Sequence, residues 1–191
     1  MNNGFEAAFQ KTVIENEGVY DNDPQDPGGE TVFGINKRDH PNWPGWKRLE
    51  DLRHAPLFPS NISPDHLMME LVRDYYRSGP WTYIHGDELL PEIAAELFDS
   101  AVNCGETRTI QWFQRALNIF NRGGTDYPDM KVDGIMGAGT VQAFVALESK
   151  RGSSLLLKAL NALQGVRYIE IAEKNPALEK FQAGWWRTRI S

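Results

Sequence analysis

The sequence predicts a mainly α-helical fold that carries one small β-hairpin. Apolar residues recur at the three- and four-residue spacing of helices through most of the 191 residues. A single short run, residues 31–35, is rich in β-formers and follows a stretch of turn-forming residues. With 41% apolar residues, the chain can bury a real core. No obvious linker separates its segments, so we expect two parts that pack together.

The first helix is predicted from Phe5 to about Glu17, and Gly18 marks its end. Its apolar face is formed by Phe5, Ala8, Phe9 and Val13. Residues 21–29 read DNDPQDPGG, and these Asp-Pro steps and paired glycines exclude a helix. The β-prone residues 31–35 that follow are expected to form one strand of the hairpin.

Residues 39–61 contain several prolines and tryptophans, and we interpret this stretch as too polar for a core element, apart from a helical turn at 49–52. The remaining helices follow it. Ser63 offers a capping hydroxyl and Pro64 a first-turn proline, which together predict the start of a helix. Pro91 opens a further helix in the same way. Later helices are expected over four ranges, about 107–121, 140–148, 154–174 and 176–189.

Charge and composition exclude several classes of protein. The formal net charge is −6, whereas a nucleic-acid-binding protein is usually basic, so we expect no nucleic-acid partner. Residues 1–100 hold 18 acidic and 8 basic side chains, and residues 101–191 hold 8 and 12, so the second part is suited to an anionic polymer. No apolar run approaches the ~18 residues of a membrane span. The first residues lack the basic run and apolar core of a secretory signal.

The sequence also argues against a metal centre. Cys104 is the single cysteine, so the chain can form neither an internal disulfide nor an all-cysteine zinc site. The four histidines, at positions 40, 54, 66 and 85, lack a ligand spacing such as HExxH. We therefore expect no metal and no cofactor.

Acid chemistry is predicted at the end of the first helix. Glu17 lies four residues after Val13, near the flank of the apolar face. A carboxyl half-buried against apolar side chains resists ionisation, so we expect a raised pKa, as a general acid near neutral pH requires. The turn-rich segment can bring further carboxylates towards it, from Asp21, Asp23, Asp26 and Glu30. One protonated and one ionised carboxyl is the glycosidase arrangement; the alternative is an ordinary helix-end carboxylate beside a surface loop.

These motifs resemble those of the glycoside hydrolase family 108 muramidases, lysozyme-like enzymes of bacteria and phages, some described as secretion activators. The matching runs near the N-terminus are Glu17-Gly18-Val19-Tyr20, Asn22-Asp23-Pro24, Asp26-Pro27-Gly28-Gly29 and Thr31 with Gly34-Ile35. Residues 98–103 and 114–118 resemble the family's central helices, and 132–140 its C-terminal half, often labelled a peptidoglycan-binding region. Val19 stands where the family's Glu-Gly-Gly-Tyr hallmark has a glycine, and it would be strained if that position takes a positive φ.

The resemblance implies a two-lobed, lysozyme-like fold, with a catalytic lobe over residues 1–105 and a helical C-terminal lobe over 106–191 packed on the first. It implies a hydrolase that cleaves the β-1,4 bond between N-acetylmuramic acid and N-acetylglucosamine in peptidoglycan glycan strands, as a lysozyme or endolysin does. Glu17 is then the general acid. Asp26 is the preferred second carboxylate, with Asp23 and Glu30 as alternatives, and Thr31 is the hairpin residue that helps to hold a water.

Four further residues are candidates for sugar binding, each with a structural alternative. Tyr20 either stacks on a sugar or packs the turn, and Trp43 either forms an aromatic platform in its proline-containing loop or packs against neighbours. Asn103 either binds sugar or caps the end of its helix. Gln111 either contacts an acetamido group or is an ordinary exposed glutamine.

Several rival functions stay open at this point. A lytic transglycosylase needs the acid but no water-activating carboxylate, and a chitinase-like enzyme would act on plain N-acetylglucosamine polymers. A non-catalytic peptidoglycan-binding or secretion-associated module would leave Glu17 idle. In each wall-directed case we expect a monomer that acts on the cell wall, either in the periplasm or outside the cell, or after release from the cytoplasm by a phage.

Overall fold

In a computed structural model, which describes residues 4–22 and 29–190, the chain is mainly α-helical, as the sequence predicts. The first helix, α1 (Gly4–Phe9), continues as a π-helical turn, η1 (Gln10–Ile14), and the chain leaves this turn just before Glu17. A π turn inserts an extra residue into a helix and is frequent at functional sites. The end of the first helix is therefore irregular in the segment that presents the candidate acid.

A small antiparallel sheet replaces the predicted hairpin. Its strands are β1 (Tyr20–Asp21), β2 (Thr31–Val32) and β3 (Ile35–Asn36), in the order β1-β2-β3. Val32 pairs with Tyr20 on one side and with Ile35 on the other. Residues 33 and 34 form the two-residue turn between β2 and β3, so the β-prone run supplies a strand and a turn.

The stretch 39–61 contains a core helix, so the expectation that it is too polar was wrong. This helix, α2 (Gly45–Arg53), buries Trp46, Leu49 and Leu52 against the next helix, α3 (His66–Tyr76). The start of α3 also differs from the prediction, because its N-cap is Asp65 rather than Ser63. The Asp65 carboxylate accepts a hydrogen bond from the Met68 backbone N–H at 2.8 Å. Two short turns follow, η2 (Arg77–Trp81) and η3 (Gly86–Glu88).

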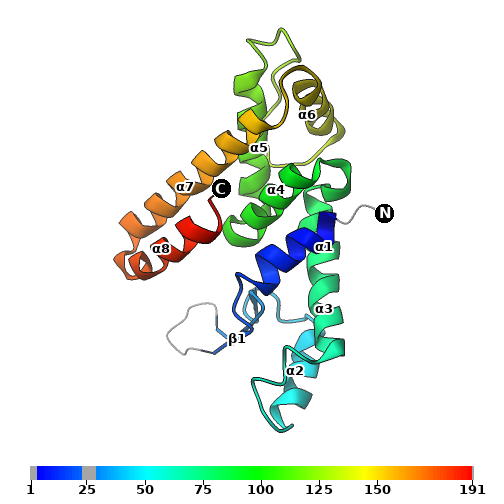
Figure 1. The fold of residues 1–191 in the computed structure, drawn as a ribbon, viewed down its shortest axis with the longest axis vertical. Helices are drawn as coiled ribbons and strands as arrows, with labels where there is room; N and C mark the ends of the chain where they lie inside the picture. The colour runs from blue at the N-terminus through cyan, green and yellow to red at the C-terminus, as the bar shows by residue number, and fades with distance from the viewer. Residues whose placement is uncertain (1–3, 23–28, 191) are drawn as a thin grey trace.

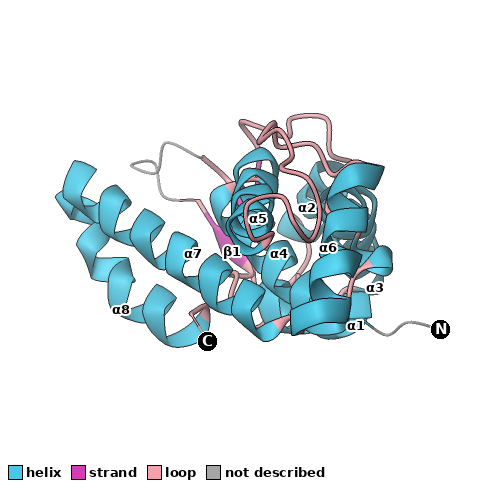
Figure 2. Cartoon of the chain, turned by 90° about the horizontal axis from the view of Figure 1, so that it is seen from above, coloured by secondary structure: helices cyan, strands magenta, loops and turns pink. Residues whose placement is uncertain are grey.

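The second part of the chain is a set of packed helices around α4 (Pro91–Cys104), which begins with the predicted proline. The next helices are α5 (Glu106–Phe120), α6 (Ala138–Arg151) and α7 (Ser154–Lys174). A short turn, η4 (Pro176–Leu178), leads into α8 (Glu179–Thr188), which folds back along α7 (Figure 1). Figure 2 shows the same pair of helices from above.

The core is continuous from α1 through α4 to the C-terminal helices. Phe5, Trp81 and Phe98 form an aromatic cluster with ring centroids 5.4–6.1 Å apart, which fixes α1 and η2 on α4. On the other side, α5 and α7 pack on α4 as well. This packing brings the end of η1, the end of α4 and the end of α8 to one place. In the described part of the chain, no helix has the length and apolar character that crossing a membrane requires.

Candidate active site

Glu17 lies just beyond η1, where its backbone N–H donates to the Val13 carbonyl at 3.2 Å. Its side chain is 21% exposed, so it is sheltered without being closed off from solvent. Val19, two residues later, is not among the described non-glycine residues with a positive φ, so its replacement of the family glycine introduces no left-handed strain. The turn after the candidate acid therefore tolerates the one departure from the motif.

The turn between β2 and β3 faces the Glu17 carboxyl. Phe33 and Gly34 both have positive φ, 45° and 79°, as a tight hairpin turn requires. A Cβ on Gly34 would lie 2.9 Å from Glu17 Oε2 and 2.9 Å from the Tyr76 hydroxyl. Since real Cβ atoms do not approach other atoms so closely, only glycine leaves room for the carboxyl here. The glycine of the motif thus permits the approach of the candidate acid to the hairpin.

Tyr76 fixes this turn from the side of α3. Its hydroxyl donates to the Phe33 carbonyl oxygen at 2.7 Å. Burial raises the pKa of Tyr76 well above its usual value, and the neighbouring Glu17 carboxylate raises it further. The phenol therefore stays protonated and keeps its role as a hydrogen-bond donor.

An arginine from the other end of the chain binds the candidate acid. Arg189 Nη2 lies 2.8 Å from Glu17 Oε1, and Arg189 Nη1 lies 2.7 Å from Asp99 Oδ1. The arginine side chain is only 4% exposed, and Asp99 also accepts a hydrogen bond from Gln164 at 3.0 Å. The sequence predicts apolar neighbours for Glu17, whereas the structure places a buried cation on one of its two oxygens.

The Glu17 carboxyl lines a cleft of about 650 Å³ between the N-terminal segment and α8. Asn103, at the end of α4, lines the same cleft, so two of the predicted site residues come together here. The other lining residues come from residues 15–16 and from the C-terminal segment: Glu15, Asn16, Leu178, Lys180, Phe181, Gly184, Trp185, Thr188 and Arg189. A cleft of this size with a carboxylate, an amide and aromatic rings is a typical binding site for a small polar ligand.

A second cavity, of about 350 Å³, reaches Gly34 from the side of β3. Its lining includes His40, Tyr75 and Glu106, and the Tyr75 hydroxyl lies 2.8 Å from His40 Nε2. Burial raises the pKa of Glu106, although the nearby His40 opposes the shift. This carboxyl was missed by the sequence reasoning, since it occupies an ordinary first-turn position of α5.

Two of the three candidates for the second carboxylate lie outside the described residues. Asp26 and Asp23 both lie in the segment 23–28, so the structure does not place them. Glu30 is described, and its carboxylate is bound by Arg53 and by Lys37, the latter at 3.0 Å. Burial tends to raise the pKa of Glu30, but hydrogen bonds from Lys37, Arg53 and Tyr20 outweigh burial and lower it.

The predicted residues of the sheet are engaged with neighbours other than Glu17. The Thr31 hydroxyl donates to the Gly29 carbonyl at 3.1 Å, and the Tyr20 hydroxyl donates to Glu30 Oε1 at 3.0 Å. The Tyr20 ring also packs edge-on against Phe58, with centroids 5.0 Å apart. Neither residue is among the described residues that line the Glu17 cleft. Their catalytic and binding roles stay predictions.

Trp43 and Gln111 also lie away from this cleft. Trp43 is 8% exposed, donates from its indole N–H to the Leu71 carbonyl at 3.4 Å, and lines a separate cavity of about 300 Å³ with His40 and Tyr75. Gln111 lies on α5, where its Cγ atom is 3.3 Å from the position a Cβ on Gly134 would take. Sugar binding by either residue stays a prediction.

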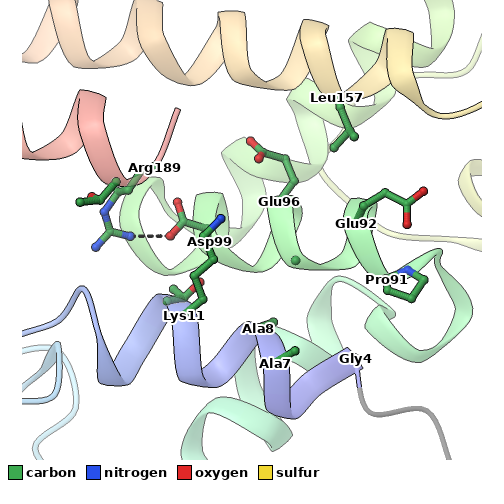
Figure 3. Close-up of a pocket in the computed structure, with 13 residues that line it drawn as sticks. Gly4, Ala7, Ala8, Lys11, Pro91, Glu92, Glu96, Asp99, Leu157 and Arg189 are labelled. Atoms are coloured by element: carbon green, nitrogen blue, oxygen red, sulfur yellow. Dashed lines mark hydrogen bonds and ion pairs between the residues drawn. The ribbon is translucent and has the colours of Figure 1, made fainter. Parts of the chain in front are cut away.

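A fourth cavity, of about 290 Å³, lies between α1 and α4 on the far side of the Arg189–Asp99 ion pair. Figure 3 shows the arginine of the C-terminal segment reaching Asp99, with Glu96 one turn away on α4 and Lys11 on the facing helix. Glu96 is 8% exposed, and its Oε1 atom has no hydrogen-bond partner among the described residues. Burial, followed by the charge of Asp99, raises the pKa of Glu96 to about 7.

Comparisons with known proteins bear on the family and the fold of the chain. A family model described as Glycosyl hydrolase 108 matches residues 10–105, and one described as Predicted Peptidoglycan domain matches residues 108–190. Among solved structures, the chain is similar to that of Brucella abortus SagA, with 21% identity and a TM-score of 0.56 over 100% of this chain and 98% of that chain. This likeness confirms the predicted mainly α, lysozyme-like fold. The search of curated proteins gives no significant match.

Proposed function

Because the chain belongs to the glycosyl hydrolase 108 family, we propose that it cleaves the β-1,4 bond between N-acetylmuramic acid and N-acetylglucosamine in peptidoglycan. The family supports a glycoside hydrolase, and the matched peptidoglycan region supports the cell wall as the place of action. The observation that carries the proposal is the position of Glu17, whose carboxyl is partly sheltered and lines an open cleft with Asn103. A glycan strand that enters this cleft meets the carboxyl directly.

In the proposed reaction, Glu17 protonates the glycosidic oxygen while positive charge builds on the sugar ring. The carboxyl needs a proton for this step, whereas in this structure it is ion-paired with Arg189. The mechanism therefore includes a step in which the entering strand separates the two side chains. Glu17 then takes up a proton before the bond breaks.

Asp26 is the proposed partner that activates a water or stabilises the charged sugar, and Asp23 is its alternative. Glu30 is less suited to this role, because Arg53 and Lys37 already occupy its carboxylate oxygens. Thr31 is proposed to help hold the water, since it lies on the strand that leads into the turn facing Glu17. We further propose that residues 1–105 form the catalytic lobe and that 106–191 form a lobe that holds the glycan strand.

The decisive experiment compares Glu17→Gln with Glu15→Gln on purified cell walls. Glu15 lines the same cleft two residues earlier, so it is a matched control for charge and position. We expect Glu17→Gln to lower the release of muropeptides by about 10²-fold or more, because a general acid contributes at least that much. Glu15→Gln is expected to stay within about tenfold of the parent. Comparable activity of the two variants would reject the acid role of Glu17.

Mass spectrometry of the released products separates the rival functions. A hydrolase leaves reducing ends on N-acetylmuramic acid, whereas a lytic transglycosylase leaves anhydromuramic ends. A binding module releases nothing, and a chitinase-like enzyme releases oligomers from chitin in preference to walls. The expected product is a muropeptide with a reducing end.

A further inference from the structure

The two walls of the Glu17 cleft have different origins and different chemistry. One wall carries the carboxyl and amide groups of Glu17, Asn16 and Asn103. The opposite wall is α8, which contributes the ring of Phe181, the ring of Trp185 and the ammonium of Lys180. The Glu17 carboxyl and α8 therefore line the same cleft, and α8 belongs to the region, residues 108–190, that matches the peptidoglycan domain.

The aromatic side chains of α8 form a stack that is rooted in the core. Tyr168 of α7 is fully buried, and its ring lies 5.1 Å from that of Trp185 at 35°. The Trp185 ring lies 6.0 Å from the Phe181 ring at 21°. Phe181 ends the stack and is 45% exposed, with Lys180 Nζ 4.8 Å from its ring centroid. The Phe181 ring is thus backed by Trp185 and lies partly open beside the Lys180 ammonium, so it offers the cleft an apolar surface next to a cation.

Trp186, the next residue on α8, has a different role. A Cβ on Gly165 of α7 would lie 2.8 Å from its ring, so this indole packs where α7 has no side chain. Trp186 does not line the cleft, whereas Trp185 does. The helix therefore uses one tryptophan to dock on α7 and directs the other towards the cleft with Phe181.

We propose that α8 is the glycan-binding wall of the catalytic cleft, a statement that rests on the function proposed above. The Phe181 ring stacks on the C–H face of a sugar ring once the Lys180 ammonium, which lies over the ring in this structure, moves onto the ligand. The Lys180 ammonium pairs with a carboxylate attached to N-acetylmuramic acid, either on its peptide stem or on its own lactyl group after the stem is removed. A flat apolar ring beside a cation matches a sugar that is apolar on its face and acidic at its edge.

The test measures binding by titration calorimetry in the inactive Glu17→Gln background, so it does not depend on hydrolysis. The probes are soluble peptidoglycan strands with peptide stems, the same strands after amidase treatment, and chitin oligomers. Phe181→Leu keeps an apolar side chain but removes the ring, and we expect it to weaken binding of all three probes about tenfold, or about 1.4 kcal/mol. Phe181→Tyr restores the ring and is expected to bind like the parent.

Lys180→Met separates the charge from the ring. We expect it to weaken binding only of probes that carry a carboxylate and to leave chitin oligomers unaffected. An effect confined to stem-bearing strands assigns the pairing to the peptide, and one confined to amidase-treated strands assigns it to the lactyl group. An equal effect on chitin would overturn the charge pairing.

Trp186→Leu is the matched control, because it loosens α8 without removing a cleft ring. We expect a lower melting temperature with binding close to that of the parent. The proposal is overturned if Phe181→Leu binds as tightly as the parent, or if Trp186→Leu weakens binding as much as Phe181→Leu does. Activity of Glu17→Gln on walls would refute the assigned acid separately, while these binding results still decide the role of α8.

Discussion

The buried carboxyl of Glu96 gives a prediction about how stability changes with pH. Its carboxyl lies on α4, one turn before Asp99, with one oxygen atom that lacks a hydrogen-bond partner. Burial, with the Asp99 charge second, raises the pKa from 4.5 to about 7. Between these two pH values the folded state holds a proton that the unfolded state has lost. The free energy of unfolding therefore falls as the pH rises through this range.

The size of this loss of stability follows from the difference between the pKa values of Glu96 in the unfolded and folded states. Each pH unit between them is worth about 1.36 kcal/mol, so ionising Glu96 in the folded state costs about 3 kcal/mol once the pH exceeds about 7. Glu96→Gln removes the charge but keeps the shape. We expect the stability of this variant, relative to the parent, to rise by about 3 kcal/mol between pH 4.5 and pH 7.

Urea unfolding followed by circular dichroism at several pH values measures this difference. Glu92→Gln is the matched control, because Glu92 lies one turn earlier on α4 and its exposed carboxylate bonds to Ser153. We expect its stability relative to the parent to stay constant with pH. A constant difference for Glu96→Gln as well would refute the reasoning, since it would show that the carboxyl has the same pKa in both states.

Three further predictions concern the turn, the ion pair and a helix cap. Gly34→Ala is expected to lower wall hydrolysis by about 10²-fold, because the added methyl group displaces the facing Glu17 carboxyl. Gly29→Ala is the control: Gly29 also has a positive φ, but no atom lies close to the position of its added methyl group, so this variant should retain activity. Arg189→Met is expected to lower the free energy of unfolding by about 3 kcal/mol or more in urea titrations, because it leaves two carboxylates without their cation. Asp65→Ala is expected to lower it by about 1 kcal/mol, whereas Ser63→Ala should have no effect, which calorimetric melting can check.

The fold could be predicted where its determinants are local. Helical periodicity and Pro91 define α4, and α7 occupies the predicted range 154–174. The misplaced start of α3 shows the limit, because Ser63 and Asp65 are both good caps and only the three-dimensional structure selects the one that reaches the Met68 N–H. Helix α2 was missed because the stretch is polar on average. Its three buried side chains, at three-residue spacing, lie among charged residues.

The candidate site could be predicted only in part. Glu17 and Gly34 belong to one short motif, so the sequence indicates both, although only the structure shows that the glycine makes room for the carboxyl. Arg189 could not be found, because it lies 172 residues from its partner and no local pattern marks it. Phe181 likewise resembles any apolar residue of a C-terminal helix. Contacts between distant segments depend on the packing of α4, α7 and α8, which periodicity does not specify.

The ion pair links the segment that carries Glu17 to Arg189, the residue that follows the last helix. A chain cut after residue 105 would keep Glu17, Gly34 and Asn103 but would lose the cation that neutralises the carboxyl and the wall that faces it. Asp99 would lose its arginine as well, and α4 would lose the cover that α7 provides. Two family models match the chain on either side of this point. The Glu17 cleft, however, is lined by residues from both matched regions. The proposed hydrolysis therefore requires both regions in one folded unit.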